Sequence, residues 1–320
     1  MLLLHIARQY YEYGMSQANI AHAMGYSRAT IGRLLADARK RGIVRIQITH
    51  PLERIIDLEV SIRRRFAIEH VHVAEAGVLR EPIDEVARAC AVLLDQVADA
   101  DSSIGISNGR IHTALPRHIR SRTNSDMTVV QLVGGLGDQA RLVDTPDLCQ
   151  QLARTYGGAA EVLSAPLLAP DEQTAQQLRS TRANTRTLQR ASEVDIALVG
   201  IGAGFRHPSG VFHGLLDQDT VRALHRAGAV GHLLGRFVDN TGHVVATQLG
   251  SRVIGLEPDS LHEIPFVIGL AAGTEKAEAI AAAMRGGYLD ALVVDVDAAQ
   301  ALAHLPEIGS SRRRERDGIG

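Results

Sequence analysis

The clearest hydrophobic pattern lies in residues 16–45, SQANIAHAMGYSRATIGRLLADARKRGIVR. Ser16 can cap a helix that buries Ile20, Ala21 and Met24, and Gly25 ends it. Ser27 can cap a second helix whose apolar residues form one stripe: Ile31, Leu34, Leu35 and Ala38. Two capped helices joined by a glycine-containing turn predict a helix-turn-helix.

The face opposite that stripe carries small and basic side chains, which favours contact with DNA because recognition helices meet base edges with their first turns. It centres on Ala29, Arg33, Ala36 and Lys40, with Arg28 and Thr30 in the first turn. The alternative is a helical hairpin whose charges are merely solvated. The predicted DNA-binding residues are Gln17, Ser27, Arg28, Ala29, Thr30, Arg33, Lys40 and Arg45.

The flanking patterns extend this unit. Residues 2–13 have helical spacing and predict a bracing helix, while the alternation of residues 44–49 predicts a strand, one arm of a wing that would bring Arg45 near phosphates. We therefore expect a DNA-binding domain over residues 1–50. Residues 51–66 predict a linker helix whose apolar stripe either docks on the rest of the chain or pairs with a second subunit; docking is the favoured alternative.

From residue 67 onward, strand-like and helix-like segments alternate, which is typical of an α/β domain with a mainly parallel sheet. Strands are expected at 70–74, 103–107, 127–132, 160–163, 196–200, 266–271 and 291–295, with short ones at 244–245 and 252–254. Helices are expected at 83–98, 110–120, 147–156, 171–190 and 277–285, and a short one ends at 303. We expect this domain to span 67–308 and the tail, residues 309–320, to be disordered.

Three of these strands end in glycine-bearing turns, at 107–110, 134–137 and 273–276. In a parallel sheet such turns meet at one edge, where helix N-termini and side chains such as Arg110 and Lys276 could bind an anionic metabolite. The alternative is that the glycines simply permit tight turns. GIGAG at 200–204 lacks the third glycine of a dinucleotide fingerprint, and no phosphate-binding P-loop is present, so we expect no nucleotide cofactor.

Composition narrows the function classes. The chain has 320 residues, of which 45% are hydrophobic, but no apolar run approaches the roughly 20 residues that cross a bilayer. No signal pattern opens the chain, so we expect a cytoplasmic protein without a membrane partner. Cys90 and Cys149 are expected in the core. His70 and His72 could share a metal, but a structural role is expected because no third ligand is near.

Charge is distributed unevenly. Residues 1–65 contain 11 Lys and Arg against 5 Asp and Glu, whereas the remainder contains 23 against 31. A basic region such as residues 1–65 attracts a polyanion, whereas the acidic remainder of the chain is repelled by it. Only residues 1–65 are therefore expected to contact DNA.

Six ordered blocks make the chain resemble the SorC family of sugar-responsive bacterial transcriptional regulators. They are SQANIAHAMGYSRATIGRLLADARKRGIV, IGISNGR, VVQLVGGLG, DIALVGIG, GAVGHLLGRFVDNTG and VIGLAAGTEKAEAIAAAMRGG. The resemblance implies a winged helix-turn-helix followed by a Rossmann-like, sugar-isomerase-type α/β effector domain. It also implies a dimer or tetramer, double-stranded operator DNA as partner and a phosphorylated sugar as effector.

By motif position, the resemblance implies effector contacts from Ser107, Asn108, Gly109, Arg110, Gln131, Gly134, Gly135, His232 and Lys276. Members often carry an acidic residue at the position of His232, and an imidazole offers one donor and one acceptor instead. Lys276 could grip a phosphate, form an imine with an open-chain sugar or pair with Glu275.

The rival hypothesis is a sugar-phosphate isomerase or deaminase with an added basic head. Catalysis would need a general base near the substrate, and the candidates by position are Asp138, Glu275, Asp295 and His232. No two of these residues have a spacing in the sequence that indicates a catalytic pair. We therefore expect a regulator without catalytic residues, metal or cofactor.

Overall fold

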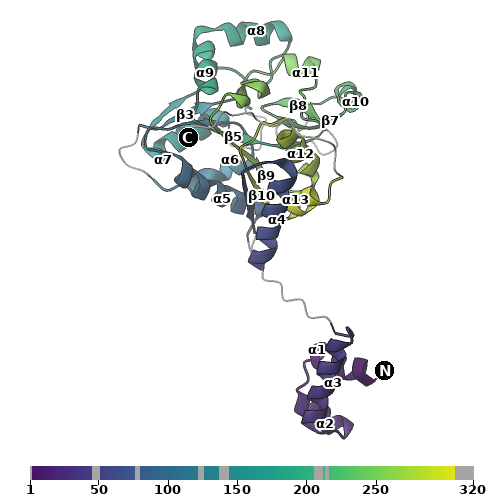
Figure 1. The fold of residues 1–320 in the computed structure, drawn as a ribbon. Coiled ribbons are helices and arrows are strands. Elements are labelled where there is room, and N and C mark those ends of the chain that lie inside the picture. Colours follow the sequence, from purple (N-terminus) through teal and green to yellow (C-terminus); the bar gives the residue numbers. More distant parts are fainter. Residues whose placement is uncertain are drawn as a thin grey trace. The chain divides into compact units, whose positions relative to one another are not determined.

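The computed structural model describes residues 2–44, 51–75, 80–121, 126–136, 144–204, 212 and 216–306. The chain divides into two compact units, Met1–Glu53 and Arg54–Gly320 (Figure 1). Each unit has a hydrophobic core of its own.

The first unit contains three helices: α1 (Leu2–Tyr11), α2 (Gln17–Met24) and α3 (Arg28–Lys40). Both predicted N-caps are confirmed, because Ser16 Oγ accepts a hydrogen bond from Asn19 N and Ser27 Oγ accepts one from Thr30 N, each at 3.1 Å. Gly25 ends α2 at φ +70°, in the left-handed region that favours glycine. The core of this unit consists of Ile6, Ile20, Ala21, Ile31 and Leu35.

One prediction for this unit differs from the structure, and another lies outside the described residues. α1 ends at Tyr11, two residues earlier than the pattern indicated. Residues 45–49 of the predicted wing strand, and with them Arg45, lie outside the described residues.

The predicted linker helix forms as α4 (Pro51–Phe66). Ile55, Ile62 and Phe66 belong to the core of the second unit. The apolar stripe of the helix therefore packs on the rest of the chain, which was the favoured alternative. The Glu59 carboxylate also accepts a hydrogen bond from Val73 N at 2.8 Å, which fixes α4 to the first strand of the sheet.

The second unit is built on a parallel sheet of seven strands in the order β1-β10-β9-β5-β2-β3-β4. From β2 the chain order runs outward through β3 and β4, and from β5 it runs the other way through β9 and β10, with β1 added at the far edge. The switch point of the topology therefore lies between β2 and β5. The strands are β1 (His70–Ala74), β2 (Ser103–Ile106), β3 (Thr128–Gln131), β4 (Ala159–Glu161), β5 (Ile196–Gly200), β9 (Phe266–Ala271) and β10 (Ala291–Asp295).

Helices cover both faces of this sheet because its strands are apolar on both sides. In Figure 1, α5 (Pro82–Val97), α6 (Arg110–Ala114) and α7 (Thr145–Tyr156) lie on one face, and α12 (Ala277–Arg285) and α13 (Val296–Ala303) lie with α4 on the other. None of the helices in the described ranges is long and apolar enough to cross a bilayer.

A small antiparallel sheet adjoins the large one and was not predicted. It consists of β6 (Gly202–Ala203), β7 (Ala229–Leu233) and β8 (Arg236–Asp239). β7 and β8 are joined by Leu234 and Gly235, with φ of +51° and +78°, the positive values of a tight hairpin turn. α10 (Gln218–Arg226) and α11 (Gln248–Ser251), also unpredicted, contribute Leu224 and Leu249 to the same core.

Two predicted helices are shorter or divided. The helix expected at 110–120 is the short α6 followed by a 3₁₀ turn, Leu115–Arg117, because Pro116 cannot continue the helical hydrogen bonding. The helix expected at 171–190 is two helices, α8 (Glu172–Ser180) and α9 (Arg182–Ser192), separated by Thr181 in an extended conformation that caps α9.

The weakest predicted strands are single bridges, Val238 with Val244 and Leu168 with Val253. Two 3₁₀ turns, Pro258–His262 and Thr274–Lys276, complete the described elements. The predicted disordered tail, residues 309–320, lies outside the described residues.

Candidate functional site

A pocket of about 600 Å³, part of it open to solvent, lies at the carboxyl ends of β2, β5 and β9. This is the edge beside the topological switch point, where open α/β sheets bind their ligands. The lining residues are Ile83, Asn108, Gly109, Arg110, Ile111, His112, Gly200, Ile201, Gly202, His232, Leu234, Gly235, Leu270 and Lys276.

The turn after β2 is tied to β5. Ser107 is buried, and its hydroxyl accepts a hydrogen bond from Gly200 N at 2.9 Å. Gly109 has φ +147°, which favours glycine, and it leads directly into α6. Ser107 therefore holds the two strand ends together without itself lining the pocket.

Close approach explains the glycines after β5. A Cβ on Gly200 would lie 2.7 Å from the carbonyl oxygen of Asn108, and one on Gly202 would overlap the ring of His232. Backbone thus forms this wall of the pocket, and the imidazole packs directly against it.

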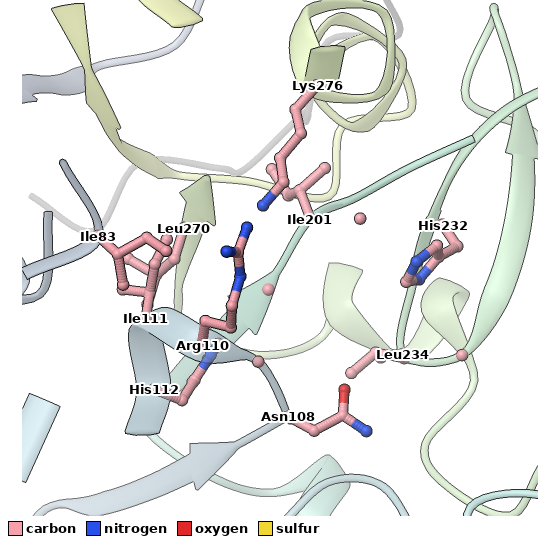
Figure 2. A pocket seen from close by; sticks show the side chains of 14 residues that line it. Ile83, Asn108, Arg110, Ile111, His112, Ile201, His232, Leu234, Leu270 and Lys276 are labelled. Atoms are coloured by element: carbon pink, nitrogen blue, oxygen red, sulfur yellow. The ribbon is translucent and has the colours of Figure 1, made fainter. Parts of the chain in front are cut away.

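Two cationic side chains reach the pocket, Arg110 from α6 and Lys276 from the turn after β9; Figure 2 shows their charged ends pointing toward one another. Burial and the charge of Arg110 lower the pKa of Lys276 to about 8, although Glu275 and Asp295 act in the opposite direction. The described lining contains no Asp or Glu. An anion would therefore relieve the repulsion between the two cations.

Two histidines line the pocket in the neutral form. Burial, followed by the charge of Lys276, lowers the pKa of His232 to about 3. Burial also lowers the pKa of His112 to about 4, against the opposing hydrogen bond to Leu198 O. His232 packs edge-on against Phe212, with ring centres 4.9 Å apart, so its wall is aromatic.

The predicted effector residues fall into two groups. The structure brings Asn108, Gly109, Arg110, His232 and Lys276 together in the pocket. It places Ser107, Gln131, Gly134 and Gly135 outside the lining. Gln131 uses its side chain within the fold, donating to Val133 O at 2.6 Å and accepting from Leu163 N at 2.9 Å.

The turn after β3 does not share the edge of the pocket with the other two glycine turns. Gly134 N donates to Ile254 O at 2.9 Å and Gly135 N donates to Ala165 O at 3.0 Å, so other segments of the chain pack against these glycines. A Cβ on Gly134 would overlap the carbonyl group of Pro166. Close packing accounts for this glycine pair.

Sequence reasoning missed several lining residues. Gly200, Ile201 and Gly202 belong to GIGAG, which was weighed only as a dinucleotide fingerprint; its position after a buried strand was the usable signal. His112 is the third residue of the helix that follows the first glycine turn, and Leu234 and Gly235 occupy the unpredicted hairpin.

In the first unit, α3 presents the predicted outer face to solvent. Arg28, Ala29, Arg33 and Lys40 are exposed, Thr30 is half-buried, and Ser27 is exposed while it caps the helix. Gln17 is half-buried at the start of α2, where a Cβ on Gly32 of α3 would lie 3.3 Å from its Oε1.

The described residues contain no group of three or more His, Cys, Asp or Glu able to hold a metal ion. His70 and His72 lie on β1, where burial lowers the pKa of His72. Of the general bases considered for a catalytic site, Asp138 lies outside the described residues, and only His232 lines the pocket.

Comparisons with known proteins agree with these features. The family described as "Putative sugar-binding domain" matches residues 50–304. The transcriptional regulator LsrR of Escherichia coli is 31% identical over 301 residues, which are 93% of this chain and 92% of the relative. The sorbitol operon regulator of Klebsiella pneumoniae is 30% identical over 322 residues, covering 94% of this chain and 97% of the relative.

Similarity extends to a solved full-length structure. The crystal structure of the sorbitol operon regulator SorC from Klebsiella pneumoniae matches with a TM-score of 0.73 and 27% identity, covering 94% of this chain and 98% of that one. These relatives are named as regulators of transcription, which agrees with the expectation of a regulator and not an enzyme. The chain belongs to the SorC family of sugar-responsive transcriptional regulators.

Proposed function

We propose that this protein binds operator DNA through a helix-turn-helix formed by α2 and α3, and that a phosphorylated sugar in the pocket controls its operator affinity. Residues 1–50, with residues 44–49 as a wing, would bind DNA, residues 51–66 would connect, and residues 67–308 would bind the effector. We place this function in the cytoplasm, in a dimer or tetramer whose symmetry matches paired half-sites.

The observation that carries the effector proposal is the pair of cations, Arg110 and Lys276, facing one another beside a switch point with no carboxylate in the described lining. A phosphate group supplies two negative charges and several acceptors to such a pair. The remaining lining is neutral, which suits the uncharged part of a sugar.

A first experiment tests each half separately. A gel-shift titration compares the protein's own promoter region with random DNA at moderate salt, and we expect a preference for the promoter. In a thermal-shift assay, pentose or hexose phosphates should stabilise the protein saturably. An activity assay with the same sugar phosphates should show no turnover. Absence of any promoter preference would contradict the DNA half; turnover of a sugar phosphate would instead favour the rival enzyme.

The exposed face of α3 gives a sharper prediction. Arg33→Ala should weaken promoter binding more than binding to random DNA, because we assign Arg33 to base edges. Lys40 lies on the same face at the C-terminal end of α3. Lys40→Ala should weaken binding to promoter and to random DNA equally, and should lower the salt dependence of binding by about one charge. Fluorescence anisotropy competition measures the affinities of the wild-type protein and both variants for each DNA. Equal losses for Arg33→Ala on both DNAs would reduce Arg33 to a phosphate contact.

A further inference from the structure

His112 presents an unused hydrogen-bond acceptor to the pocket. Its ring is fully buried, and Nε2 lies 3.1 Å from the carbonyl oxygen of Leu198. A carbonyl oxygen can only accept, so Nε2 carries the ring proton and Nδ1 carries a lone pair. Nδ1 has no hydrogen-bond partner among the described residues.

Two glycines keep side chains away from this lone pair. A Cβ on Gly109 would lie 3.2 Å from Nδ1, and one on Gly200 would lie 3.1 Å from the adjacent Cε1. Both glycines line the pocket together with His112, so no side chain from either glycine covers the ring edge that carries Nδ1. A buried acceptor without a partner is destabilising, which makes a ligand donor favourable there.

Asn108 supplies the complementary group. Its Nδ2 is also buried without a hydrogen-bond partner among the described residues, and the residue lines the same pocket. An amide nitrogen donates and the imidazole Nδ1 accepts. A polyhydroxylated ligand can satisfy both groups, because each hydroxyl group donates one hydrogen bond and accepts others.

We propose that His112 is a specificity-determining residue that accepts a hydrogen bond from a hydroxyl group of the effector, with Asn108 donating to the uncharged part of the same molecule. This inference rests on the proposed function, since it assumes that the effector's phosphate binds Arg110 and Lys276. A carbonyl, ether, methylene or fully ionised phosphate group cannot donate to Nδ1, so polyhydroxylated phosphates are selected. The low pKa of His112, about 4, keeps the lone pair available at neutral pH.

The test uses the full-length protein and calorimetric titration with inorganic phosphate, ribose 5-phosphate, glucose 6-phosphate, fructose 6-phosphate and sorbitol 6-phosphate. We expect at least one sugar phosphate to bind more tightly than inorganic phosphate. In His112→Phe, which keeps a ring but removes both nitrogens, the tightest sugar phosphate should lose about tenfold or more in affinity. The affinity for inorganic phosphate should change by less than about threefold, because we expect this anion to bind at the two cations and not at the His112 ring.

A matched control and a second measurement keep the test decisive. His262→Phe removes an imidazole that approaches a main-chain carbonyl, Gly286 O at 2.9 Å, outside the pocket lining, and should leave every affinity unchanged. In the wild-type protein, the ¹⁵N resonance of His112 Nδ1 should shift with the tightest sugar phosphate but not with inorganic phosphate; this measurement decides the matter if His112→Phe does not fold.

The outcomes separate the two proposals. If neither inorganic phosphate nor any sugar phosphate binds, the proposed effector class is wrong and this inference falls with it. If inorganic phosphate binds but the sugar phosphates bind no more tightly, the assignment of His112 alone is overturned. The same holds if His112→Phe keeps the wild-type affinity for the sugar phosphates and the Nδ1 resonance does not shift when they bind.

Discussion

Lys276 combines charge with burial in a way that makes anion binding depend on pH. The two histidines of the pocket lining, His112 and His232, have pKa values of about 4 and 3 and stay neutral above pH 5. With a pKa of about 8, Lys276 is therefore the lining group expected to change charge between pH 6.5 and 9.5.

Sulfate affinity should accordingly fall as the pH rises through 8. Sulfate is a dianion throughout this range, so only the protein titrates. Loss of the ammonium charge removes a charge-assisted contact, for which we expect about a tenfold rise in the Kd between pH 6.5 and 9.5. Lys276→Arg should bind sulfate with little dependence on pH. A flat profile in the wild-type protein, measured by calorimetry, would show that Lys276 does not contact the anion.

At the residue scale, the sequence could predict which side chains follow the strands. It could not show which of these side chains form hydrogen bonds within the fold and which face the pocket. Arg110 and Lys276 reach the pocket as the glycine turns predicted, and Asn108 reaches it as the resemblance implied. Gln131 was implied by the resemblance, yet its amide is hydrogen-bonded to two backbone groups of residues outside the pocket lining. His112 became visible only when the pairing of β2 with β5 brought Leu198 O beside it.

At the element scale, α3 depends on its first residues for two separate tasks. Ser27 caps the helix through Thr30 N at 3.1 Å and is hydrogen-bonded to the Thr30 hydroxyl at 2.8 Å. In the proposed complex the same end of α3 approaches the DNA, whose phosphates carry negative charge. Capping and DNA contact can be separated, because aspartate caps helices as well as serine does but repels phosphate.

Ser27→Ala should destabilise the first unit by about 1 kcal/mol through loss of the cap, which hydrogen exchange of the α3 amides would detect as faster exchange. Ser27→Asp should keep the wild-type exchange rates and yet weaken operator binding about tenfold at low salt, with a smaller loss at high salt. If Ser27→Asp binds the operator as the wild-type protein does, this end of α3 does not face the DNA backbone.

Elements with a strong apolar pattern could be predicted closely. The strands at 266–271 and 291–295 and the helix at 277–285 have the predicted bounds, because each is a continuous or periodic apolar segment in the core. β7 and β8 were missed because their turn places Leu234 at φ +51°, a conformation that a β-branched or bulky residue seldom adopts and that no turn signal announced. Thr181 likewise divides a region whose helical spacing continues across it.

At the scale of the whole molecule, hydrogen bonds connect the pocket with the linker helix. Asp295 accepts from Gly273 N at 3.1 Å, in the turn that carries Lys276, and from Ala298 N at 3.2 Å, in the first turn of α13. At the other end of α13, Arg65 of α4 donates to Leu302 O at 3.3 Å, to Ala303 O at 3.0 Å and to Leu305 O. Because α13 is a rigid element held at both ends, a shift of the turn on effector binding can be transmitted to α4, from which the chain continues into the first unit.

Arg65→Ala should therefore weaken regulation more than it weakens either binding event. The guanidinium is held by three carbonyl oxygens at the end of α13, and its removal frees α4 from that end while the pocket residues remain in place. We expect the sulfate Kd and the operator Kd without effector to change by less than about threefold. The ratio of operator Kd values with and without a saturating sugar phosphate, which measures the coupling free energy, should move toward one. Arg64→Ala removes an exposed neighbour of the same charge from α4 and should preserve that ratio. If both variants keep the wild-type ratio, coupling does not pass through α13 and Arg65, and the contacts of α4 with β1 through Glu59 become the next candidates.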